Sequence, residues 1–125
     1  MAIRKQSQVI LASAARTATI VSPVLSAEEA ICTDIVIDVT VDPSTASLVP
    51  TVEGKDPVSG NFYAIATGAA VAAVGTTAIR IGKDIATTTT DKVNAMLPAE
   101  YRLTMTAASN QSITYSVTAT HMVNI

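Results

Sequence analysis

The chain is poor in the residue types that usually carry out chemistry. Its 125 residues include one cysteine, one histidine and no tryptophan. A single cysteine excludes an intrachain disulfide, and Cys32 fits a buried apolar thiol better than a nucleophile. A base to activate Cys32 would have to be His121, and the sequence contains neither a nucleophile elbow nor a phosphate-binding glycine loop. We therefore expect a protein that is not an enzyme, with no catalytic residue, cofactor or small-molecule substrate.

Charge is also scarce. Charged residues make up 14% of the chain, and eight basic against ten acidic residues leave a net charge of −2. A nucleic-acid partner requires a basic surface that displaces counterions, so we expect no nucleic-acid binding. A soluble monomer usually carries about a quarter charged residues. The low value predicts that much of the surface packs against other subunits. The alternative is a surface that is sparsely charged without contacting other subunits.

Metal binding and membrane insertion have little support. Asp34 and Asp38 lie four residues apart on a predicted strand, about 13 Å, which is too far for one ion, so we expect surface charges and no metal site. The apolar stretch 9–14 is too short for a signal peptide, and no run approaches the length of a membrane span. We expect a soluble protein made in the cytoplasm.

What the sequence does contain is period-two alternation. Ile35, Ile37 and Val39 alternate with more polar neighbours, which places an aliphatic stripe on one face of a strand. Similar patterns predict strands at 17–21, 31–41, 48–54, 61–67, 75–81, 101–106 and 113–119. Pro50 lies within one of them and favours an edge position or a bulge. The turn 55–61 contains Pro57 and Gly60, which is typical of a hairpin with a bulge.

Two short segments predict helical turns. Ser26 and Glu29 form a capping box, and residues 91–97 precede Pro98, which would end a helix. The fold class we expect is all-β: an antiparallel β-sandwich, Ig-like or jelly-roll-like, of about seven or eight strands with one or two short helical turns. We expect residues 1–15 to form an N-terminal arm and residues 16–125 to form the sandwich domain.

The arm and the hairpin are the expected interaction sites. Residues 1–15 either add a strand to a neighbouring protein or form the edge strand of their own sandwich. The hairpin tip is either an interaction loop or a solvated turn. The interface hypothesis comprises Ile3, Arg4, Val9, Ile10, Leu11, Lys55 and Asp56.

One part of the sequence resembles a known group of proteins. The segment 37–63, with Ile37-Asp38-Val39-Thr40 and the turn Gly54-Lys55-Asp56-Pro57-Val58-Ser59-Gly60-Asn61-Phe62-Tyr63, is similar to small virion proteins of tailed phages that are encoded among head genes. Further similarity extends the resemblance over roughly residues 12–120. These motifs are strands and turns, so they identify a lineage better than an activity.

The resemblance implies a β-sandwich subunit of the virion. It favours a head decoration, or cement, protein that binds the capsid exterior together with the major capsid protein and copies of itself, as a trimer or a dimer. Two alternatives remain open: a head–tail completion, tail or fibre-associated subunit, and a non-viral binding module such as a carbohydrate-binding sandwich. Sugar binding usually needs exposed aromatic platforms, and Tyr101 and Tyr115 share the apolar stripes of their strands and are expected in the core.

Overall fold

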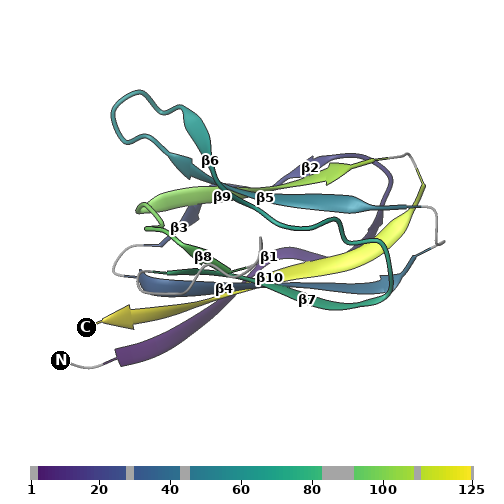
Figure 1. Cartoon of the computed structure of the whole chain (residues 1–125), viewed down its shortest axis with the longest axis horizontal. Helices are drawn as coiled ribbons and strands as arrows, with labels where there is room; N and C mark the ends of the chain where they lie inside the picture. The colour runs from purple at the N-terminus through teal and green to yellow at the C-terminus, as the bar shows by residue number, and fades with distance from the viewer. Residues whose placement is uncertain (1–2, 28–29, 43–45, 83–91, 109–110, 125) are drawn as a thin grey trace.

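The chain forms a sandwich of two β-sheets (Figure 1). The computed structural model describes residues 3–27, 30–42, 46–82, 92–108 and 111–124. The strands are β1 (Ile3–Arg16), β2 (Ile20–Val21), β3 (Leu25–Ser26), β4 (Ala30–Val41), β5 (Leu48–Lys55), β6 (Phe62–Thr67), β7 (Gly75–Gly82), β8 (Lys92–Asn94), β9 (Glu100–Ala107) and β10 (Ile113–Asn124). No helix occurs among these residues.

The first sheet has the strand order β1-β10-β4-β7-β8, and the second has the order β2-β9-β5-β6, with β3 also paired to β9. All strand pairs are antiparallel except β7 and β8, which run parallel. The predicted all-β sandwich is confirmed. Seven of the strands overlap the seven predicted ones, β2 among them; the other three are β1, over the predicted arm, and the short strands β3 and β8.

The core lies between the sheets and follows the predicted alternation. Inward-facing residues at every second position of β4, β9 and β10 are fully buried, among them Ile35, Ile37, Leu103 and Val117. The alternation arises because successive side chains of a strand point to opposite faces. Tyr101 and Tyr115 are the largest buried side chains, as expected from their places in these stripes. With so few aromatic residues, small aliphatic side chains fill most of the interior.

The segment predicted as an arm is an integral strand. β1 pairs with β10 from Ile3, opposite Asn124, to Arg16, opposite Ile113. Of the two alternatives for this segment, the structure has the edge strand of the chain's own first sheet. The start of β1 and the end of β10 lie side by side at one end of the molecule (Figure 1).

The predicted helical turns are wrong where the structure describes them. Residues 92–94 form β8, because Val93 pairs with Ile81 of β7 and packs against the core. Ser26 lies in β3, paired with Glu100; residues 28, 29 and 91 lie outside the described part of the chain. In both places pairing with a neighbouring strand overrides the local capping and proline signals.

Of the two alternatives predicted from Pro50, the edge strand is wrong, because β5 is an internal strand between β9 and β6, whereas a register shift does occur in the β5–β6 pair, between Val52 and Glu53. Pro50 lies opposite Met105 of β9, and pairing with β6 begins one residue later, at Thr51. The Pro50 carbonyl accepts a hydrogen bond from the Gly68 amide, just beyond β6. The amide and carbonyl of one strand residue point the same way in an antiparallel ladder, so the donor that proline lacks faces the place where β6 ends.

Candidate interaction surface

The turn between β5 and β6 is held by one carboxylate. Asp56 Oδ1 accepts from the Val58 amide at 2.9 Å, and Oδ2 accepts from the Ser59 hydroxyl at 2.9 Å. The Asn61 amide donates to Ser59 Oγ at 3.1 Å, and Gly60 takes the positive φ of 78° that the turn requires. The hydrogen bonds, that of the Val58 amide first, lower the pKa of Asp56. The predicted hairpin turn is therefore present, and side-chain hydrogen bonds of Asp56 and Ser59 hold it.

A second cluster fixes the base of this hairpin to the sheet. Glu53 Oε1 accepts from Thr104 Oγ1 at 2.6 Å and from Arg102 Nε at 3.0 Å. These donors, Thr104 first, lower the pKa of the Glu53 carboxyl. The Arg102 guanidinium also lies 3.7 Å from the centre of the Phe62 ring, at the first residue of β6. Both arms of the hairpin are thus tied to β9.

The apex of the hairpin exposes an apolar side chain. The hairpin bends away from the rest of the second sheet and projects beyond it (Figure 1). Val58 at the apex is 94% exposed, the largest value among the large hydrophobic residues of the described chain. The interface hypothesis named Lys55 and Asp56 and did not include Val58. The sequence did contain a signal for its exposure: Val58 is an apolar residue inside a turn, between Pro57 and Ser59.

The interface residues predicted on the N-terminal segment differ in how exposed they are. Arg4 is exposed and Val9 is 65% exposed, so both side chains are available to a partner. Ile10, in contrast, is only 6% exposed and belongs to the core, and Leu11 packs against the core. Ile3 pairs with Asn124 through the backbone. The structure does not bring this segment together with the hairpin tip in one site, because they belong to different sheets.

His121 joins the two sheets at the end where β1 begins. Its ring is buried, and Nδ1 lies 2.8 Å from Thr33 Oγ1 of β4. Nε2 lies 3.2 Å from the amide nitrogen of Gln8 and 3.1 Å from the hydroxyl of Tyr101. Because the Gln8 amide nitrogen can only donate, Nε2 accepts and the ring proton lies on Nδ1, where it is donated to Thr33. Burial lowers the pKa of His121 and raises that of Tyr101 to about 12, which favours the neutral forms of this network.

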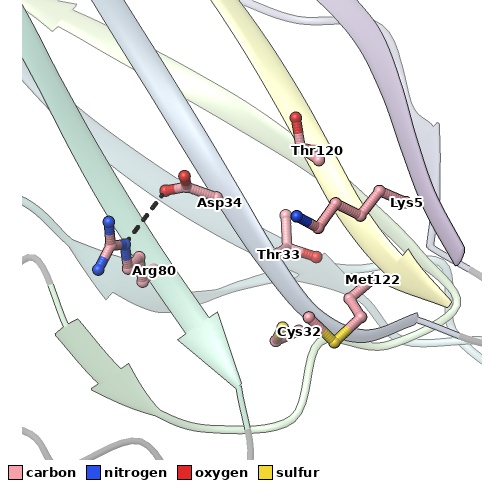
Figure 2. Close-up of a pocket in the computed structure, with 7 residues that line it drawn as sticks. All are labelled: Lys5, Cys32, Thr33, Asp34, Arg80, Thr120 and Met122. Atoms are coloured by element: carbon pink, nitrogen blue, oxygen red, sulfur yellow. Dashed lines mark ion pairs between the residues drawn. The ribbon is translucent and has the colours of Figure 1, made fainter. Parts of the chain in front are cut away.

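A shallow hollow of about 290 Å³ lies on the outer face of the first sheet (Figure 2). Asp34 of β4 and Arg80 of β7 form an ion pair on one side of it, with 3.6 Å between Oδ1 and Nε. Cys32 and Met122 lie together at one end, and Lys5 and Thr120 complete the rim. The lining therefore carries two cationic side chains and one carboxylate, and the carboxylate pairs with one of the cations, Arg80.

The described residues contain no group of histidine, cysteine, aspartate or glutamate side chains arranged to hold a metal ion. Over the same ranges, no helix has the length and apolar character needed to cross a membrane.

Comparison with known proteins identifies a fold relative. No protein-family model matches the sequence, and no curated protein matches it. The chain is similar in structure to the SPBc2 prophage-derived protein YomS, with a TM-score of 0.58 and 11% sequence identity. The similarity covers 98% of this chain and 96% of YomS. At this identity the comparison shows a shared fold over the whole chain, and that fold also occurs in a prophage-derived protein.

Proposed function

We propose that this chain is a structural protein of a tailed-phage virion and that it decorates the outside of the capsid. Its partners are the major capsid protein and further copies of itself, in a homo-trimer or homo-dimer. It is made in the host cytoplasm and ends on the capsid exterior. Two observations on different scales support the proposal: the resemblance of residues 37–63 to phage head proteins, and the fold shared with a prophage-derived protein.

The observation that carries the proposal is the hairpin apex. Asp56 orders the turn through its hydrogen bonds, and the order is present before any partner binds. A preordered loop loses little conformational entropy on binding. Covering an exposed valine gains about 1.5–3 kcal/mol. Repeated over many sites on one particle, such modest contacts act together, because neighbouring copies raise one another's effective concentration.

The test replaces the apex residue. Val58→Asp keeps the turn's hydrogen bonds, since those involve only the backbone of residue 58, but places a charge where an apolar contact is proposed. We expect particles that carry this variant to lose most of the protein and to break open at a lower temperature. Occupancy is measured as the ratio of this chain to the major capsid protein on stained gels of purified particles.

Val74→Asp is the matched control. Val74 is 62% exposed and lies outside the strands, so the substitution adds the same charge elsewhere on the surface. It should leave occupancy unchanged. Equal occupancy for wild type and Val58→Asp would contradict the proposed role of the apex.

A further inference from the structure

The outer edge of β1 is open. β1 is the first strand of its sheet and has β10 on one side, with no described strand on the other. From Ile3 to Val9 its register with β10 is regular, residue by residue. A regular open edge presents unpaired amides and carbonyls that another strand can join.

The remainder of β1 is closed to such pairing. The register shifts between Val9 and Leu11 and again between Leu11 and Ala14, so this half is bulged. The Arg16 guanidinium donates to the carbonyls of Ala12 and Ala14, at 2.5 Å and 3.4 Å. Bulges and occupied carbonyls are devices that stop an edge from accepting a strand. The available edge is therefore limited to residues 3–9.

The open half is bonded to the neighbouring strand β10 through side chains as well as through the backbone. The Ser7 hydroxyl lies 3.0 Å from that of Thr120, and Gln8 bonds His121, which in turn bonds β4 and β9. A strand fixed in this way does not need to be ordered by its partner. Preordering lowers the cost of binding, as it does for the hairpin.

Charge identifies the kind of segment that fits. β1 holds three of the eight basic residues of the chain and none of the ten acidic ones, and Arg4 and Lys5 lie in the open half. Two copies of this edge paired with each other would bring together two basic strands, with no acidic residue of β1 to complement them. The other edge strands, β2, β3, β6 and β8, contain no acidic residue, so a second copy offers no complementary edge among the described strands.

We propose that residues 3–9 of β1 are an acceptor edge for an extended acidic segment of a different protein chain, which binds as an added strand. The inference rests on the proposed function only for the identity of that chain, a virion protein. It assigns to this segment the role of acceptor within its own sheet, in place of a free arm that is donated to a neighbour.

The test uses the full-length protein and a synthetic peptide with blocked ends in which glutamate alternates with valine. We expect the peptide to bind, measured by fluorescence anisotropy, and to slow amide hydrogen exchange within residues 3–9. The same peptide with alternate amides methylated should lose binding, because it cannot form the ladder. A peptide with lysine in place of glutamate should bind about tenfold more weakly.

Two variants complete the experiment. Arg4→Glu combined with Lys5→Glu should reverse the preference between the two peptides, since both side chains are exposed and the backbone edge is unchanged. Lys92→Glu makes a similar change on β8, at the opposite edge of the sheet, and should have no effect. No binding, equal binding of both peptides, or protection at β8 in place of β1 would overturn the inference.

The outcomes separate this inference from the proposed function. If the wild-type protein occurs on particles but binds no acidic strand, the acceptor edge is refuted and decoration stands. If it binds the acidic peptide at residues 3–9 but is absent from particles, the acceptor edge is supported and decoration is refuted.

Discussion

At the scale of single residues, Gly54 shows why one position of a strand admits no side chain. It is buried in β5, and a Cβ there would lie 2.6 Å from Pro98 Cγ, 2.8 Å from Ile65 Cδ1 and 2.9 Å from Tyr63 Cζ. Because Gly54 has no side chain, β6 and the segment before β9 can pack closely against β5 at this position. The glycine is part of the motif that resembles phage head proteins, and the structure gives it a packing reason.

Gly54→Ala should therefore destabilise the protein by about 1–3 kcal/mol, the usual cost of overpacking a core. The measurement is urea denaturation followed by circular dichroism. Combining the change with Pro98→Ala, which removes the nearest clashing atom, should recover part of the loss. An unchanged midpoint for Gly54→Ala would show that the contact is not tight in solution.

His121 predicts a pH dependence of stability. Burial lowers its pKa in the folded protein below the ordinary value of 6.5, so the unfolded chain binds a proton more readily than the folded one. The contribution of His121 to the free energy of unfolding should be constant above that value and fall as the pH drops through it. Below the folded-state pKa, where both states are protonated, this contribution stops changing.

The measurement is urea denaturation at a series of pH values, with the ring titration of His121 followed by NMR in the wild type. His121→Gln removes the titrating group and should remove this part of the slope. A ring that titrates at or above 6.5 in the folded protein would contradict the assignment of a neutral, buried imidazole.

At the scale of elements, strand composition explains what could be predicted from the sequence. Ile35, Leu103 and Val117 alternate with polar residues because one face of each strand is buried, so their period shows both the strand and its inner face. Arg16 could not be predicted in the same way. Its bonds to Tyr115 and to bulged carbonyls depend on pairing across 99 residues, which no local pattern encodes.

The positions of the residues in the interface hypothesis could be predicted only in part. The hairpin could be located because Pro57 and Gly60 restrict the backbone locally. The exposure of Val58 could not be predicted, because it depends on how the hairpin bends away from the sheet. Ile10 was included with its exposed neighbours, but a register shift beside it turns its side chain into the core.

The β5–β6 hairpin should lose order when its carboxylate is removed. Asp56→Ala deletes the acceptor for the Val58 amide and the Ser59 hydroxyl, so the Val58 amide should exchange faster with solvent. Protonation acts similarly: the folded-state pKa of Asp56 lies below its ordinary 3.8, so the turn should loosen only in strong acid. The measurement is amide hydrogen exchange by NMR.

Glu100→Ala is the control for this change. Glu100 forms an exposed ion pair with Lys55 at 3.8 Å, a contact that contributes little to stability. Glu100→Ala should therefore leave hydrogen exchange at the Val58 amide unaltered. If Asp56→Ala also leaves it unaltered, the carboxylate does not order the turn.

At the scale of the whole molecule, the protein is a two-layer sandwich with three surface features of different character. The hairpin apex projects from one sheet, the regular half of β1 forms an open edge of the other, and the outer faces carry few charges. These features fit the proposed role in adhesion, in which contacts would be spread over separate surfaces. These features also suit a particle that binds many copies at equivalent positions.

The number of copies per particle tests this account most directly. It is measured by quantitative mass spectrometry of purified virions, with the major capsid protein as the internal standard. Decoration of the capsid predicts hundreds of copies, in a fixed ratio to the capsid subunits. A count that matches a single neck or tail ring, or the absence of the protein from virions, would contradict it.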